Sequence, residues 1–122
     1  MSLPVPIDRL REEIGGFGPA FLLTVTDDAR PHAVAVAPQW DGDRLRAGAG
    51  RTSRANAAVR PEVTLLWPGA GPGEFSLIVD ATATVDDAAE TVTLVPTRAV
   101  LHRPAPGGTG SDCVDLAKTQ PA

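Results

Sequence analysis

A run of alternating side chains between Phe75 and Val85 constrains the fold more than any other feature of the sequence. Successive side chains of a strand point to opposite faces, so such a run predicts a long strand with one face against a core. One face holds Phe75, Leu77, Val79, Ala81, Ala83 and Val85, and the other holds Ser76, Ile78, Asp80, Thr82 and Thr84. A strand of this length needs partners, and the chain is therefore predicted to build a sheet.

Five further segments have strand composition and are separated by turn residues. They span residues 21–26, 32–38, 44–48, 62–67 and 91–102. The Asp41-Gly42-Asp43 turn predicts that segments 32–38 and 44–48 are antiparallel neighbours. Pro96 has no N–H to donate, which predicts an edge or a bulge in the last strand. Asp80 needs a partner on a mostly apolar strand, and Arg98 is the predicted cross-strand ion pair.

Two helices are predicted. Residues 7–14 carry Ile7, Leu10 and Ile14 on one stripe and are followed by two glycines. Residues 52–59 form the second helix, which ends before Pro61. The predicted fold class is mainly β: a six-stranded antiparallel barrel with a short N-terminal helix and one helix between strands three and four. A sandwich is the alternative.

Length and composition limit the class of protein. The 122 residues are enough for one domain, predicted over residues 1–103, with a proline- and glycine-rich tail over residues 104–122. Cys113 is the only cysteine, so no disulfide framework is available, and no apolar leader is seen; a cytoplasmic protein without membrane insertion is expected. A net charge of -4 argues against a nucleic-acid partner.

The segment from Gly48 to Asn56 is the predicted anion site. Glycines follow a strand-like run, and Arg51, Thr52, Ser53 and Arg54 open a helix, where unpaired N–H groups and the helix dipole attract phosphate. Ten of the eleven basic residues are arginine, whose planar fork suits phosphate oxygens. Ordinary capping by Thr52 or Ser53, with solvated arginines, explains the same residues equally well.

The order of these elements and several phrases resemble the FMN-binding split β-barrel superfamily of pyridoxamine 5'-phosphate oxidase-like proteins, which includes flavin and deazaflavin reductases. The resemblance covers roughly residues 7–103. It is carried by residues 21–26 (FLLTVT), 28–32 (DARPH), 40–43 (WDGD), 51–56 (RTSRAN) and 60–66 (RPEVTLL).

This resemblance implies a homodimer that holds its cofactor in grooves at the dimer interface. Phosphate is expected at the helix start, and the flavin ring is expected along strands two and three. The phosphate ligands would be Arg51, Thr52, Ser53, Arg54 and Asn56, and the ring neighbours would be Val36, Ala37, Pro38, Gln39 and Trp67. Many members carry a lysine where this chain has Ser53.

The implied function is that of an FMN- or deazaflavin-dependent oxidoreductase acting on a small molecule. The alternative is a non-catalytic dimer that binds or sequesters a flavin, haem or another small ligand. No catalytic triad, zinc motif or other metal site is recognisable, so the catalytic residues are left unassigned. His32 is expected to bond neighbouring backbone, His102 to be a solvated strand end, and Trp40 to pack on the core.

Overall fold

The computed structural model describes residues 1–105, which form a curled antiparallel sheet with two short α-helices. The elements in chain order are β1 (Ser2–Pro4), the 3-10 helix η1 (Ile7–Arg9), α1 (Leu10–Ile14), β2 (Ala20–Val25), β3 (Pro31–Val36), β4 (Gln39–Asp41), β5 (Arg44–Gly48), α2 (Arg51–Val59), β6 (Glu62–Trp67), β7 (Ser76–Asp86) and β8 (Thr91–His102). None of the helices within residues 1–105 has the length and apolar character needed to cross a bilayer.

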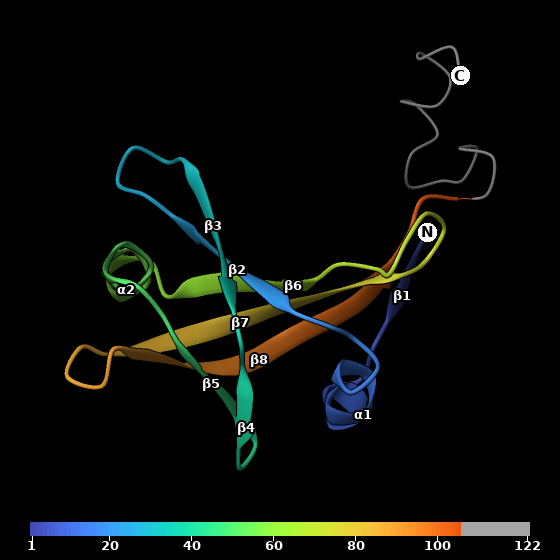
Figure 1. Ribbon diagram of the computed structural model, residues 1–122, viewed down its shortest axis with the longest axis horizontal. Helices are drawn as coiled ribbons and strands as arrows, with labels where there is room; N and C mark the ends of the chain where they lie inside the picture. The colour runs from blue at the N-terminus through green and yellow to red at the C-terminus, as the bar shows by residue number, and fades with distance from the viewer. Residues whose placement is uncertain (106–122) are drawn as a thin grey trace.

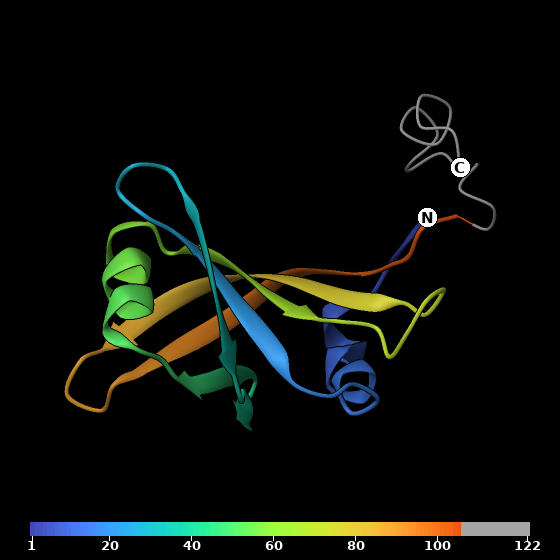
Figure 2. The same ribbon diagram turned by 45° about the horizontal axis from the view of Figure 1, so that its top comes forward.

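The strands follow the order β3-β2-β6-β7-β8-β5-β4, with β1 added to β8, and every pair is antiparallel. The long strands β7 and β8 run side by side along the molecule, and the β2–β3 hairpin crosses over them (Figures 1 and 2). α2 lies at one end of this pair, and α1 lies toward the other. The predicted mainly β class is confirmed, but the described residues contain eight strands rather than six, because β1 and β4 were not predicted.

The predicted pairing of segments 32–38 and 44–48 is wrong. β3 ends at Val36, and the short strand β4 pairs with β5 across the Asp41-Gly42-Asp43 turn. Pro38 has no N–H for a ladder, so the chain leaves one strand and begins another at this point. β3 and β4 therefore lie at opposite ends of the strand order, although they are consecutive in the chain. The sheet curls around the core and leaves a split between β3 and β5.

The alternating run of β7 forms the centre of the core, as predicted. Leu77, Val79 and Ala81 are buried, and they pack with the inward-facing leucines of the neighbouring strands. The predicted stripe of the first helix is correct for Leu10, which is fully buried. It is wrong for Ile7, which is 44% exposed, because the chain forms a separate 3-10 turn before α1 instead of one continuous helix.

The bulge predicted at Pro96 is confirmed. Asp80 pairs with Arg98 and Ala81 pairs with Pro96, so Thr97 is the extra residue on β8. The predicted ion pair is also present, with 3.7 Å between the Arg98 guanidinium and the Asp80 carboxylate. Cys113 and all of the predicted tail except residues 104 and 105 lie outside the described residues.

Candidate functional site

Two adjoining hollows meet at Gly48, the last residue of β5. The first, of about 380 Å³, is lined by His32, Val34, Ala35, Val36 and the continuous segment from Gly48 to Ser53. The second, of about 390 Å³, is lined by Ala37, Gln39, Trp40, Asp41, Arg46, Ala47, Gly48 and Thr91. Gly48 borders both, and we call the two together the split groove. The first hollow lies between β3 and β5, which are not paired, and the second lies over the paired strands β4, β5 and β8.

The N-terminus of α2 opens onto this groove without a cap. The N-cap residue is Gly50, and no side chain caps the helix, so the predicted capping by Thr52 or Ser53 is wrong. The first helical bond runs from the Arg54 N–H to the Gly50 carbonyl, and the three preceding N–H groups have no helical partner. A Cβ added to Gly48 or Gly50 would meet no atom within 4 Å, so the groove is open above the backbone of both glycines.

The two arginines of α2 have different environments. Arg51 is exposed, lines the split groove, and has no hydrogen bond, ion pair or ring contact with any residue of 1–105. The Arg54 side chain is 12% exposed and donates to the Ala49 carbonyl at 2.6 Å and to the Asp87 carboxylate at 3.0 Å. Arg54 therefore holds the start of α2 against the β7–β8 turn, while Arg51 is available to an anion.

Arg46 is a second unpaired cation beside the groove. Within residues 1–105, Arg30, Arg46 and Arg51 are the arginines whose side chains have no partner. Two of these three line the split groove, one in each hollow. Because surface arginines in this chain are otherwise paired with acids or carbonyls, this arrangement favours an anionic ligand.

Two buried polar atoms in the groove also have no partner among the described residues. They are Nδ1 of His32, in the first hollow, and the hydroxyl of Thr91, in the second. A buried polar group without a partner is costly and often marks a ligand site. The prediction that His32 bonds backbone is therefore not met at Nδ1. The inward position of His32 could have been read from the sequence, because His32 alternates with Val34 and Val36 on the more buried face of β3. No sequence pattern indicated that Thr91 would line a groove.

Two of the predicted phosphate ligands, Ser53 and Asn56, are oriented toward the protein interior. Ser53, Asn56 and Ala57 share the buried face of α2, which packs on β2 and β7. The Asn56 amide donates to the buried Thr24 hydroxyl at 3.0 Å, and Asn56 does not line the groove. Ser53 borders the groove but is itself buried.

Trp67 does not fit the predicted role of a ring-stacking residue. It is 3% exposed and belongs to the core cluster, because it alternates with Val63 and Leu65 on the inward face of β6. Trp40 instead lines the groove while packing on the core as predicted, and the Arg11 guanidinium stacks 4.5 Å from its ring centre. Pro38 does not border either hollow, whereas Val36, Ala37 and Gln39 do.

The groove offers chemistry for binding rather than for acid or base attack. Its lining provides cations, free backbone N–H groups, one imidazole and a flat tryptophan ring, with Asp41 as the single carboxylate. The described residues contain no group of three or more acids, histidines or cysteines that could hold a metal ion. The arrangement therefore suits a ligand with a negatively charged tail and a flat body.

Solved structures identify the class of fold. The chain has the split-barrel fold of the flavin-binding, pyridoxamine 5'-phosphate oxidase-like proteins. A candidate pyridoxamine 5'-phosphate oxidase of Listeria innocua has a TM-score of 0.63 at 18% identity, over 78% of this chain and 96% of the other. An F420 reductase has a TM-score of 0.54 at 20% identity, over 66% of this chain and 87% of the reductase. An FAD-binding protein of Mycobacterium smegmatis has a TM-score of 0.55 at 13% identity, over 84% and 100%.

Within this fold, sequence similarity places the chain in a narrower family. It belongs to the family of the uncharacterized proteins Mb0449c of Mycobacterium bovis and MT0457 of Mycobacterium tuberculosis. Each is 40% identical to this chain over a 116-residue alignment, and the match covers 83% of this chain and 82% of the relative. No family model matches the sequence.

Proposed function

We propose that this protein is a homodimeric oxidoreductase of small-molecule metabolism that binds a flavin or deazaflavin cofactor in the split groove. The observation that carries the proposal is the convergence of two unpaired arginines and an uncapped helix N-terminus on one groove. The split-barrel fold, which solved flavin- and deazaflavin-related proteins share, supports it.

The residues at the α2 end of the groove fit a phosphate. Arg51 supplies a charged fork, and the free N–H groups of residues 51–53 supply backbone donors. Gly48 and Gly50 let the phosphate approach the backbone because neither carries a Cβ. FMN and the deazaflavin coenzyme both carry phosphate on their tails, so this end of the groove accepts either; we favour FMN as the cofactor and keep a deazaflavin as the alternative.

The other end of the groove fits a flat ring. Val36, Ala37 and Trp40 supply apolar surface, and the Thr91 hydroxyl and Gln39 supply polar contacts at the rim. A bound flavin or deazaflavin supplies hydride transfer, and the protein then has to position the ring, exclude water and hold protons. His32 is the ionisable side chain of the groove whose buried Nδ1 has no partner within residues 1–105, so it is our candidate to hold a proton near the ligand.

A second copy of the chain would complete the groove. Ala35 of the groove begins a row of outward-facing apolar residues that crosses four neighbouring strands through Phe21, Leu66 and Ile78. Val25 and Val95 lie on the same face beyond a polar row of Thr64, Asp80 and Arg98, and both valines are exposed in the single chain. Because monomeric proteins seldom leave a row of apolar side chains of this extent in water, we propose that this face forms the homodimer interface.

The cofactor proposal is tested by titrating the purified protein with FMN and, separately, with a deazaflavin coenzyme, following ligand fluorescence. Arg51→Ala should weaken binding about 10- to 100-fold, since a hydrogen bond to a charged group contributes about 1.5–3 kcal/mol. Arg30→Ala is the matched control, because it removes another unpaired arginine from outside the groove.

Gly48→Val tests whether one ligand spans both hollows. The added side chain stands in open space where the hollows meet, so the fold should be kept while the groove is blocked. Gly71→Val, at another glycine with open surroundings, is its control. Unchanged affinity in both Arg51→Ala and Gly48→Val would overturn the proposed site.

A turnover assay distinguishes an oxidoreductase from a non-catalytic protein that binds or sequesters the ligand. Cofactor reduction with a nicotinamide donor, followed by oxidation by an acceptor, would support an oxidoreductase. Tight binding with no turnover across a panel of acceptors would instead favour a protein that sequesters the ligand.

The dimer is tested by light scattering. Ile78→Glu should give monomers, whereas Val59→Glu, which places the same charge on α2 at a valine that is 64% exposed, should not. A monomeric unchanged protein would contradict the proposed interface.

A further inference from the structure

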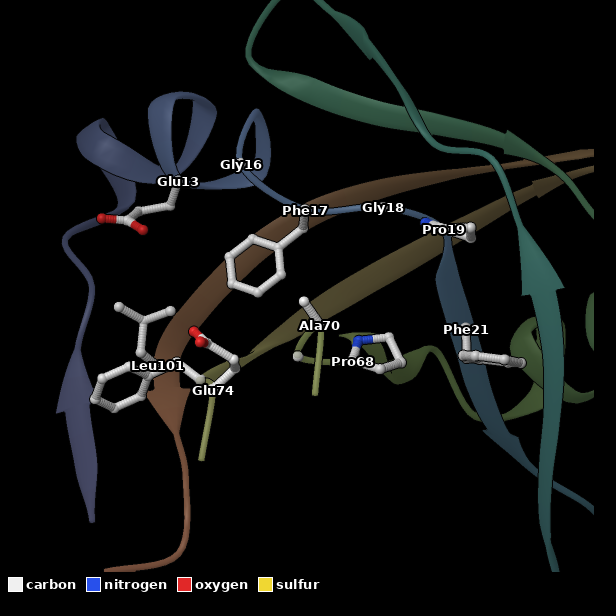
Figure 3. A pocket seen from close by; sticks show the side chains of 12 residues that line it. Glu13, Gly16, Phe17, Gly18, Pro19, Phe21, Pro68, Ala70, Glu74 and Leu101 are labelled. Atoms are coloured by element: carbon white, nitrogen blue, oxygen red, sulfur yellow. The ribbon is translucent and has the colours of Figure 1, made fainter. Parts of the chain in front are cut away.

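Another hollow lies away from the split groove and shares no lining residue with it. It measures about 610 Å³ and is enclosed by the chain that follows α1, the start of β2, the loop between β6 and β7, and Leu101 of β8 (Figure 3). Its volume is within the range of sites that hold small molecules. We call it the phenylalanine pocket.

The aromatic lining of this pocket is unusual for this chain. The sequence contains three phenylalanines and no tyrosine, and all three phenylalanines, Phe17, Phe21 and Phe75, line this one hollow. Pro19, Pro68 and Leu101 complete an apolar wall. In the single chain Phe17, Phe75 and Leu101 are half-buried and Phe21, which also belongs to the proposed dimer face, is 38% exposed, so their surfaces are reachable from the hollow.

The charged side chains of the pocket are both acidic. Glu13, at the end of α1, and Glu74, just before β7, border the aromatic wall, and Figure 3 shows both carboxylates over the space near Leu101. No lysine, arginine or histidine lines the pocket. Neither carboxylate has an ion pair or hydrogen bond with any residue of 1–105. Glu12, the neighbour of Glu13, is by contrast paired with Arg9 at 3.3 Å.

One ring of the pocket already contacts a cation. The Arg103 guanidinium lies 4.3 Å from the centre of the Phe75 ring, within the distance at which a cation is attracted to an aromatic face. The backbone at Phe75 approaches Gly69 closely, since a Cβ added to Gly69 would lie 2.7 Å from the Phe75 carbonyl oxygen. The loop is therefore shaped by backbone contacts, which gives the pocket a defined wall.

We propose that the phenylalanine pocket binds an organic cation: an amine or quaternary ammonium that carries an apolar body. The body would pack on the phenylalanines and Leu101, and the cationic group would lie between Glu13 and Glu74. Unpaired carboxylates beside aromatic faces favour a positive ligand on two independent grounds, charge and ring quadrupole. An anionic ligand of the same shape would be repelled.

The test uses three probes with one apolar body and different charges: 4-phenylbutylamine, 4-phenylbutanol and 4-phenylbutyrate. Binding to the full-length chain is measured by calorimetry, with line broadening in proton spectra of the probe for weak binding. We expect the amine to bind at least tenfold more tightly than the alcohol, and the acid not to bind, since a charge-assisted hydrogen bond is roughly twice as strong as a neutral one.

Variants assign the effect to the pocket. Glu13→Gln and Glu74→Gln should each lower the affinity of the amine about five- to tenfold while leaving that of the alcohol unchanged. Glu62→Gln, which makes the same change in net charge on β6 outside the pocket, should have no effect. Phe17→Leu keeps an apolar side chain and should reduce the preference for the amine over the alcohol.

Three results would overturn the proposal. The first is equal affinity for the amine and the alcohol. The second is a loss of amine affinity in Glu62→Gln as large as that in Glu13→Gln and Glu74→Gln. The third is binding that appears only in Ile78→Glu, the variant designed to be monomeric, because this would mean that a second copy of the chain fills the pocket. Because the split groove shares no residue with this pocket, cofactor binding can fail or succeed independently of these results.

Discussion

Arg54 and Arg51 should have opposite effects on stability, although they lie three residues apart on the same helix. Replacing Arg54 with alanine removes the bond from its guanidinium to the Ala49 carbonyl at 2.6 Å and the ion pair with Asp87. A hydrogen bond from a charged donor contributes about 1.5–3 kcal/mol. The ion pair adds less than about 1 kcal/mol, because the Asp87 side chain is 82% exposed and solvent screens it.

The helix dipole works against both arginines, because they are cations near a helix N-terminus. Their removal recovers about 0.3–1 kcal/mol each. Arg54→Ala should therefore lower the free energy of unfolding by about 2 kcal/mol. This is the contribution of the lost hydrogen bond and ion pair, reduced by the relief of the unfavourable interaction with the helix dipole. Arg51 has no bonds to lose within residues 1–105, so Arg51→Ala should leave the protein unchanged or more stable by up to about 1 kcal/mol.

Urea unfolding at one fixed protein concentration measures both changes, since the stability of the proposed dimer would depend on concentration. Asp87→Ala is the control that isolates the ion pair, and it should cost less than about 1 kcal/mol. The reasoning is refuted if Arg54→Ala changes the unfolding free energy by less than about 0.5 kcal/mol, within the range of ordinary surface substitutions. It is also refuted if Arg51→Ala destabilises as much as Arg54→Ala.

Three further substitutions test the fold. Asn56→Ala should cost about 1–3 kcal/mol in urea unfolding, because it leaves the buried Thr24 hydroxyl without its donor; a loss below about 0.5 kcal/mol would contradict this. Asp80→Asn should cost less than about 1 kcal/mol, since Arg98 is 65% exposed, and a larger loss would show that the pair is poorly screened. Gly69→Ala should lower the melting temperature by several degrees, about 1–3 kcal/mol, because its Cβ would clash with backbone oxygens; an unchanged melting temperature would contradict the close approach.

The strands that the sequence predicted correctly are those whose pattern is local. Residues 62–67 and 91–102 match β6 and β8, and the run from Phe75 to Val85 buries the face that alternation assigns to the core. The bulge at Pro96 also followed from one residue, because a missing N–H acts on the backbone at its own position.

The missed strands depend on distant partners. β1 is three residues long, and all three are exposed, so its sequence carries no alternation. It exists because its residues pair with β8, about a hundred positions later in the chain. β4 is equally short, and it is defined by pairing with β5 rather than by its own composition.

In the candidate site, too, local features were predicted from the sequence and features that depend on distant residues were not. The sequence located the α2 start with Arg51, because a glycine-rich turn before a helix is a local pattern, but it could not separate Arg51 from Arg54. That distinction arises from Asp87, which the β7–β8 turn brings to the helix from thirty-three positions away.

By itself, the sequence determined the mainly β class, the positions of most strands, the core face of β7 and the glycine- and arginine-containing start of α2. Periodicity, turn chemistry and helix ends are properties of neighbouring residues, which is why they can be read along the chain. The tertiary structure alone decided that His32 and Thr91 face one groove and that all three phenylalanines line another hollow. Pockets are formed by strand order and register, and these are fixed only when segments far apart in the chain pack around one core.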